Sequence, residues 1–330
     1  MQQILPKQTM EEEVIRGLKK KIKYKEVVRS LTEGLDRSEL QSLLLDVFQK
    51  KAAQISPTTL FGNYKTNRFV SHSPLDPLLI SKFDVIAFEL LPDEFKRIEL
   101  SPVSPLGSCS SIATVSQDKV ISASRNVEVT SDATNILALE AALLRKNIIV
   151  EAHNISNDIH LAASHRVIRT QLFENEKFTP HFKLFNLCSA GRDKGDKVFE
   201  IEVAILHIEY YISLLYKVLD LKKIRQITIR LLNFNKGNEL LKGGILKHFA
   251  NQEYEKIHFM VDQKDVNGIN YYEELRIMIN VTNSQNQTFH LVDGGYTDWT
   301  RKILSDKKER LLTSCIGTEL LLKTMDLSDF

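Results

Sequence analysis

The chain has 330 residues, of which 43% are hydrophobic and 26% are charged. This composition is typical of a soluble protein that can bury one large core or two smaller ones, and the 13 Gly and 8 Pro exclude collagen-like and low-complexity classes. Because 44 Lys and Arg nearly balance 42 Asp and Glu, the net charge gives no general reason to bind a nucleic acid or a membrane surface.

The N-terminal sequence and the cysteines indicate the cellular compartment. The first residues lack the basic start and apolar segment of a signal peptide, and no apolar run approaches the roughly 20 residues that span a bilayer. The three cysteines are far apart and form no C-x-x-C pair, which excludes a disulfide framework and a thiolate zinc site. We therefore expect a cytoplasmic protein with no membrane association and no metal site built from protein side chains alone.

The first sixty residues read as helices. Apolar residues recur every three to five positions from Glu11 to Leu31, which predicts an amphipathic helix, and Ser38 with Gln41 predicts the capped start of a second helix. Prolines then interrupt residues 56–107, and we interpret that stretch as connections around a few short elements. The expected organisation is an N-terminal helical segment over residues 1–60 and one domain over residues 61–330.

The remaining sequence alternates strand-like and helix-like patterns. In chain order it predicts a strand at 120–129, a helix from 131, antiparallel strands at 165–171 and 182–188, a helix at 199–219, a strand at 225–232, a mixed helical segment to about 256, a hairpin of 276–282 with 288–292, and a last strand followed by a helix from 317. A small insertion is expected near 233–265. Antiparallel pairs with helices inserted between them predict an α+β fold with a large antiparallel sheet flanked by helices.

Common signature motifs are absent from the sequence. It contains no G-x-G-x-x-G, no G-x-x-x-x-G-K-[ST], no H-E-x-x-H and no G-x-S-x-G. These absences exclude the commonest phosphate loops, helical zinc sites and nucleophile elbows.

The string VIRTQ, followed by a loop and HFKLF, resembles motif 2 of the class II aminoacyl-tRNA synthetases, most nearly histidyl-tRNA synthetase and its relative, the regulatory subunit of ATP phosphoribosyltransferase. The resemblance implies that Arg169 binds the α-phosphate of ATP, a task that suits the planar guanidinium, and that Phe185 stacks on adenine. Gln171 stands at the glutamate position of the motif and is a further candidate ATP contact. There is a structural alternative for each residue: Arg169 could point outward from an edge strand, and Phe185 could be an ordinary core residue.

Two more segments carry the resemblance. SDATNILALEAALLR is similar to the family's R-P-E-G-T-A segment, which implies that Asp132 and Thr134 receive the substrate's amino group, although both residues could simply cap a helix. NGINYYEELRIMINV and DGGYTDW are similar to two segments of the histidyl enzyme, and the substrate-binding residues implied by them are Tyr271, Tyr272, Gly294 and Gly295. The tyrosines could equally be ordinary strand residues, and the glycines could serve only a turn.

Several positions depart from the family's pattern. Asn267 and Asn270 replace an arginine and an aspartate of the histidyl enzyme, so histidine specificity is not expected. SCIGTELLL is similar to motif 3, with Glu319 matched, but Leu320 replaces the arginine that meets the γ-phosphate. Losing one charged phosphate ligand costs a few kcal/mol of transition-state stabilisation. Glu202 and Glu319 are the candidate carboxylates for ATP and its Mg²⁺.

Two functions follow from the resemblance and both stay open. In the first, the chain binds ATP with Mg²⁺ and an amino or carboxylic acid, and forms an acyl-adenylate for an acceptor other than tRNA, because no anticodon-binding domain is expected after the motif 3-like segment. In the second, the chain is a non-catalytic regulatory or scaffold subunit that senses a metabolite in a degenerate pocket. Family members dimerise through the motif 1 region, so a homodimer is expected, with the segment near residues 80–105 and the preceding helices contributing. A protein partner is a further expectation.

Overall fold

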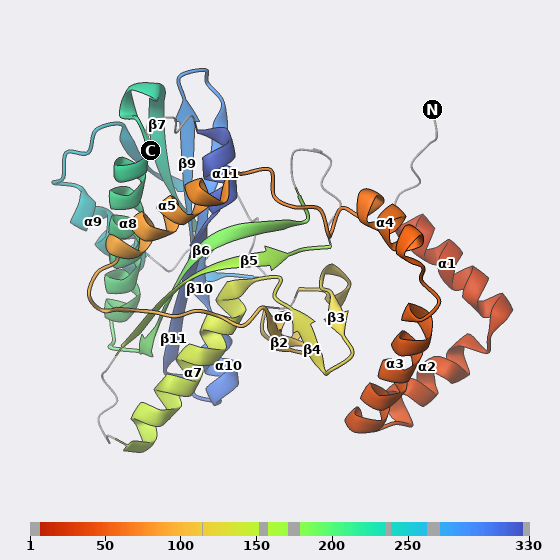
Figure 1. Ribbon diagram of the computed structural model, residues 1–330. Helices are drawn as coiled ribbons and strands as arrows, with labels where there is room; N and C mark the ends of the chain where they lie inside the picture. Colours follow the sequence, from red (N-terminus) through yellow and green to blue (C-terminus); the bar gives the residue numbers. More distant parts are fainter. Residues whose placement is uncertain are drawn as a thin grey trace. The chain divides into compact units, whose positions relative to one another are not determined.

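The computed structural model describes residues 7–113, 115–151, 158–170, 179–234, 239–262 and 271–325 (Figure 1). It divides into two compact units, one running to Tyr64 and including Ala123–Asn126, the other formed by Lys65–Ser122 and Val127–Phe330. Within the described residues, no helix is long and apolar enough to cross a membrane.

The N-terminal helices differ in detail from the predicted ones. The helix predicted over residues 11–31 is two helices, α1 (Lys7–Lys21) and α2 (Tyr24–Glu33), and α3 (Arg37–Ala52) starts one residue before the predicted Ser38. Asp36 and Glu39, rather than Ser38 and Gln41, form the capping box of α3. A fourth helix, α4 (Pro57–Thr66), occupies a stretch predicted to be irregular, because proline is tolerated in the first turn of a helix.

The second unit is built on one large sheet. Its strand order is β1-β5-β6-β11-β10-β9-β7-β8, with parallel pairing only at the two edges, β1 with β5 and β7 with β8. The predicted α+β fold with a large, mainly antiparallel sheet is therefore confirmed. The strands are β1 (Phe95–Arg97), β5 (Ile159–Ile168), β6 (His181–Arg192), β7 (Ile224–Asn233), β8 (Ile257–Asp262), β9 (Glu273–Asn283), β10 (Thr288–Thr297) and β11 (Glu309–Ile316). A second, three-stranded sheet consists of β2 (Val103–Pro105), β4 (Val127–Val129) and β3 (Ser122–Ala123).

Two apolar cores lie on the two faces of the large sheet. One core joins the sheet to α5 (Pro77–Glu89), α8 (Val198–Val218) and α9 (Glu239–Phe249), and the other joins it to α7 (Ala133–Glu151). On β6, Leu184 belongs to the α7 core and its neighbour Phe185 to the α8 core, because successive strand residues point to opposite faces. The remaining helices are short: α6 (Ser108–Ile112), α10 (Trp299–Leu304) and α11 (Thr318–Thr324).

The double glycine lies inside a strand and not in the turn that its sequence indicates. β10 continues past Gly294 and Gly295 to Thr297, and neither glycine has positive φ. A Cβ at Gly294 would lie 2.4 Å from the Cβ of Ser314, and one at Gly295 would lie 2.7 Å from the ring of Tyr272. The glycines therefore let neighbouring side chains pack close to the strand.

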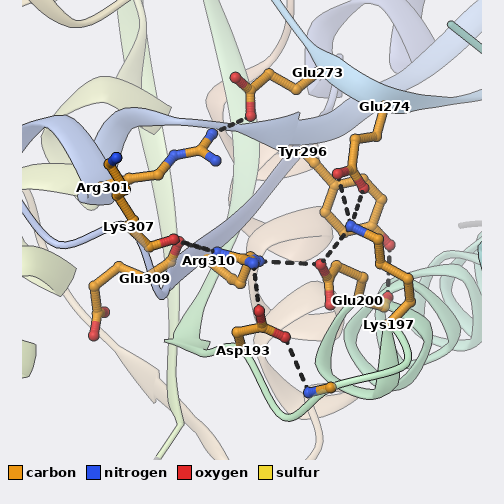
Figure 2. Close-up of polar contacts among 11 residues, drawn as sticks. Asp193, Lys197, Glu200, Glu273, Glu274, Tyr296, Arg301, Lys307, Glu309 and Arg310 are labelled. Carbon is orange, nitrogen blue, oxygen red and sulfur yellow. Dashed lines mark hydrogen bonds and ion pairs between the residues drawn. The ribbon is translucent and has the colours of Figure 1, made fainter. Parts of the chain in front are cut away.

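A network of charged side chains joins the start of α8 to β11 (Figure 2). The buried carboxylate of Glu200 accepts from Arg310 Nε at 3.1 Å and lies 3.3 Å from Lys197 Nζ. Arg310 also pairs with Asp193, and Lys197 with Glu274. The polar segment 190–197, predicted as a connection, thus continues β6 to Arg192 and then supplies two members of this network.

Candidate functional site

A cavity of about 640 Å³ lies in the second unit, where the ends of β5, β6, β9, β10 and β11 meet the start of α7 and the helix α11. Four segments that the sequence resemblance singled out meet there. The predicted site residues that line this cavity are Asp132, Thr134, Arg169, Tyr271, Tyr272 and Glu319. The fold thus brings residues up to 187 positions apart in sequence to one site.

Asp132 is the centre of one hydrogen-bonded group in the cavity. Its Oδ1 accepts from the backbone N of Thr134 at 3.0 Å and from the Thr134 hydroxyl at 2.7 Å, and its Oδ2 accepts from the hydroxyl of Tyr271 at 2.9 Å. Burial raises the pKa of Tyr271 well above its usual value, so the hydroxyl keeps its proton and donates it. Asp132 therefore caps α7 and also places a carboxylate at the cavity wall, so its two sequence readings are compatible.

Arg169 lies beside this group. Its Nε donates to the carbonyl oxygen of Ser131 at 3.0 Å, and its Nη2 lies 3.5 Å from Asp132 Oδ2. Burial opposes the charge on Arg169, but Asp132 and other neighbours favour it, and its pKa is raised overall. Its guanidinium carbon lies 5.4 Å from the ring centre of Phe182. The cavity thus holds a permanent cation next to an aromatic ring.

The structure does not bring Phe185 to this cavity. Phe185 is fully buried on the α8 face of β6, 5.9 Å from the ring of Tyr210 and 4.9 Å from that of Phe88. Phe182, three positions earlier and on the opposite face, lines the cavity instead. The alternation of side chains along the predicted strand could have distinguished these two phenylalanines, since residues three positions apart on a strand point to opposite faces of the sheet.

Glu319 lines the cavity but its carboxylate is occupied. It lies 2.6 Å from Arg166 Nη1 and 3.1 Å from Lys323 Nζ, and it accepts from the hydroxyl of Ser73 at 3.0 Å. Leu320, at the motif 3 arginine position, also lines the cavity. The segment therefore presents an apolar side chain and a neutralised carboxylate to a ligand.

Three other predicted contacts are not at the cavity. Glu202 is 56% exposed and pairs with Lys194 at 2.7 Å. Gly294 and Gly295 are not among the residues that line the cavity. Gln171, Asn267 and Asn270 lie outside the described residues.

The candidate carboxylates Glu202 and Glu319 do not form a Mg²⁺ site with other side chains that the structure describes. Glu319 is held in ion pairs and Glu202 lies elsewhere, and within the described ranges no three His, Cys, Asp or Glu side chains gather as metal ligands. A divalent cation at this cavity would have to take its ligands largely from a bound phosphate chain and water.

Sequence reasoning passed over a second charged group in the cavity. Arg276 on β9 forms a bidentate pair with Asp293 on β10, with Nε to Oδ1 at 2.7 Å and Nη2 to Oδ2 at 3.0 Å. The guanidinium carbon of Arg276 lies 5.7 Å from the ring centre of Tyr272. The two residues are 17 positions apart, so only the antiparallel register of β9 and β10 reveals the pair.

Two cysteines also line the cavity. Burial raises the pKa of Cys109 and of Cys315, and nearby Asp132 raises both further. Both side chains are therefore thiols at neutral pH. Because the thiolate and not the thiol is the nucleophile, neither of these two cysteines is activated for nucleophilic attack.

Comparison with known proteins gives a fold. No family model and no curated protein matches the sequence. Among solved structures, S. aureus histidyl-tRNA synthetase matches at 13% identity and TM-score 0.53, over 76% of this chain and 66% of that chain. A structure described as the RNA binding domain of threonyl-tRNA synthetase from Cryptosporidium parvum matches at 8% identity and TM-score 0.54, over 74% and 62%.

A third match is an ATP phosphoribosyltransferase regulatory subunit/histidyl-tRNA synthetase from Bacillus halodurans, at 10% identity and TM-score 0.51, over 78% of this chain and 82% of that chain. The match to each of the two synthetases spans less than two thirds of that synthetase chain. The chain therefore has the class II synthetase-like fold that its motifs predict.

Proposed function

We propose that the chain binds an amino acid, or another carboxylic acid that carries an amino group, together with an adenine nucleotide in this cavity, and that it acts as a ligand-sensing regulatory or scaffold subunit. The observation that carries the proposal is the position of Asp132 and Arg169 in one cavity, 3.5 Å apart. A carboxylate and a guanidinium at that spacing suit a ligand that carries an ammonium group next to an anionic group.

Asp132 is the proposed receptor for the ammonium group. Three donors from Thr134 and Tyr271 fix the orientation of its carboxylate. A bound ammonium would add a charge-assisted hydrogen bond, which contributes about 1.5 to 3 kcal/mol. Thr134 and Tyr271 are then positioning residues for this contact.

Arg169 and Phe182 are the proposed nucleotide contacts. A guanidinium can hold a phosphate through two parallel N–H bonds, and a neighbouring aromatic ring offers a surface on which a purine can stack. Phe182 takes the stacking role that the sequence resemblance implied for Phe185, because it lies on the cavity face of β6.

The regulatory role is supported by the motif 3-like segment. Leu320 supplies no charge for a γ-phosphate, and the ion pairs of Glu319 with Arg166 and Lys323 occupy the carboxylate that the resemblance assigned to ATP. One structural neighbour is described as a regulatory subunit, which agrees with a role exerted on a protein partner.

An acyl-adenylate-forming ligase is the second candidate, and the Asp132–Arg169 pair also favours it. In that reaction a carboxylate oxygen of the acid attacks the α-phosphorus of ATP, the bond to pyrophosphate breaks, and an acyl-adenylate forms. Arg169 would stabilise the charge that develops on the α-phosphate. The acceptor would be a molecule other than tRNA.

Calorimetric titration of the full chain with a panel of amino acids, with and without ATP and Mg²⁺, tests the proposal. Asp132→Asn keeps the shape of the side chain and removes its charge, so we expect it to weaken amino acid binding at least tenfold, about 1.4 kcal/mol, and to leave nucleotide binding largely intact. Asp46→Asn, at an exposed position of α3, is the matched control.

Failure of the wild-type chain to bind any amino acid would overturn the proposal. Pyrophosphate exchange measured on the same samples separates the two candidates. Exchange that depends on an amino acid and is lost in Arg169→Ala would establish the ligase, whereas binding without exchange supports the sensor.

A further inference from the structure

The cations that line the cavity are unequally available to a ligand. Four of them already face a carboxylate: Lys183 pairs with Asp84, Arg276 with Asp293 and Lys323 with Glu319, and Arg169 lies 3.5 Å from Asp132, the longest of the four distances. Moving Lys183, Arg276 or Lys323 onto a phosphate would leave a carboxylate partly buried without a counter-charge, which is costly. Asp132 differs from these carboxylates, because in the proposed function the ammonium group of the ligand becomes its counter-charge when Arg169 turns to a phosphate.

Lys119 and Arg169 are the two cations of the lining that remain for a phosphate, and they lie on adjoining backbone. Lys119 is half-buried and forms no ion pair with any residue that the structure describes. Its carbonyl oxygen accepts from the backbone N of Thr170, the residue after Arg169, so the two cationic residues enter the cavity from adjoining backbone. Arg169 Nε donates to the carbonyl oxygen of Ser131, and the rest of the guanidinium lies beside Asp132 and Phe182.

The rest of the lining discourages further negative charge. Leu320 is apolar, and Glu319 and Asp293 each hold a carboxylate there. A triphosphate chain carries about two more negative charges than a monophosphate, and these charges would meet either an apolar side chain or a cation that is already paired.

We infer that the nucleotide ligand of this cavity carries a single phosphate, as a nucleoside monophosphate either free or esterified to a carboxylic acid, rather than a triphosphate. The inference rests on the proposed function, since it requires the cavity to hold a nucleotide. The phosphate lies between Lys119 and Arg169, the base lies against Phe182, and the ammonium group of an esterified amino acid reaches Asp132. Such a chain responds to an adenylate and not to the ATP level.

Calorimetric titration of the full chain with AMP and with ATP, first without and then with Mg²⁺, is the direct test. We expect AMP to bind at least tenfold more tightly than ATP in both conditions. Arg169→Ala and Lys119→Ala should each weaken AMP binding at least tenfold, whereas Lys82→Ala, at an exposed position of α5, should leave it unchanged.

A gain-of-function variant makes the test independent of loss of folding. Leu320→Arg replaces an apolar side chain, which we infer disfavours a triphosphate, with a cation. The variant should therefore bind ATP at least tenfold more tightly than the wild-type chain and bind AMP with unchanged affinity. Equal or tighter binding of ATP by the wild-type chain would overturn the inference and leave the proposed function in place. Absence of binding by both nucleotides, with amino acid binding retained, would overturn the inference together with the nucleotide part of the proposed function.

Discussion

His207 Nδ1 and the Oγ of Ser314 are joined by a hydrogen bond of 2.8 Å between α8 and β11. The bond belongs to a continuous chain of side chains within the α8 core: His160, Ser189, His207, Ser314 and Tyr211 are linked by contacts of 2.8 to 2.9 Å. Four of these five side chains are buried. The order of donors along this relay therefore decides which nitrogen of each histidine carries a proton.

The first prediction concerns that order. The buried hydroxyl of Tyr211 has Ser314 as its hydrogen-bond partner within the described residues, so we expect it to donate to Ser314. Ser314 then donates to His207 Nδ1, and the proton of His207 lies on Nε2 and points to Ser189. ¹⁵N spectra of the histidine side chains should show His207 with an unprotonated Nδ1; the opposite tautomer would contradict the prediction.

Removing the hydroxyl of Ser314 should destabilise the protein. Ser314→Ala leaves both His207 Nδ1 and the Tyr211 hydroxyl without a partner, and a cost of about 2 to 4 kcal/mol in the free energy of unfolding is expected. Tyr211→Phe should cost only about 1 kcal/mol, because Ser314 can still donate to His207. Urea unfolding compares the two, with Ser284→Ala at an exposed position as the control; equal losses would argue against the proposed order of donors.

The titration of His207 should make stability depend on pH. Burial, together with the nearby His160, lowers the pKa of His207 from its ordinary value of 6.5 to about 3. The unfolded chain therefore takes up a proton below about pH 6.5 that the folded chain does not, so stability is fully present above that pH. It should fall by up to about 1.4 kcal/mol per pH unit as the pH drops toward 3.

Urea unfolding at about pH 7.5 and about pH 5.5 measures this contribution as the difference between wild type and His207→Gln. The variant cannot titrate at this position and should show the shallower dependence. An identical dependence in both proteins would mean that His207 is not neutral in the folded state.

The charged network at the start of α8 predicts a different pattern (Figure 2). Arg310→Met removes one of the two cations that face the buried Glu200 and should cost about 3 kcal/mol or more. Glu200→Gln combined with Arg310→Met leaves no unpaired charge at Glu200 and should cost less than the single change. Urea unfolding of both variants measures the costs; a larger loss in the double variant would show that hydrogen-bond geometry, rather than charge, dominates there.

The expected homodimer can be tested on α5. Leu78 and Val85 are 70% and 55% exposed and lie seven positions apart, so they share one face of the helix within the segment expected to dimerise. We expect wild type to be a dimer at micromolar concentration by light scattering, and Val85→Asp to shift it to a monomer. Leu143→Asp, at an exposed position of α7, should not do so, and a monomeric wild type would contradict the expectation.

The predicted elements of the second unit were mostly right because their signals are local. The apolar run from Phe199 to Leu219 and the alternation near 225–232 and 276–282 are visible in any short window, and α8, β7 and β9 lie there. The edge strand β8 was missed, since it follows a helix without a turn signal and pairs on one side only. Asp36 was passed over as a cap because Ser38 offered a similar pattern two residues later.

The sequence by itself determined the α+β class and which segments resemble a synthetase core, since apolar periodicity and short motifs are properties of neighbouring residues. Tertiary structure decided which side chains share the cavity. Phe182 replaced Phe185 there because strand parity, not motif spacing, chooses the face. Glu319 on α11 was found occupied because Arg166 reaches it from β5. Contacts between residues far apart in sequence depend on register and strand order, which no local pattern encodes.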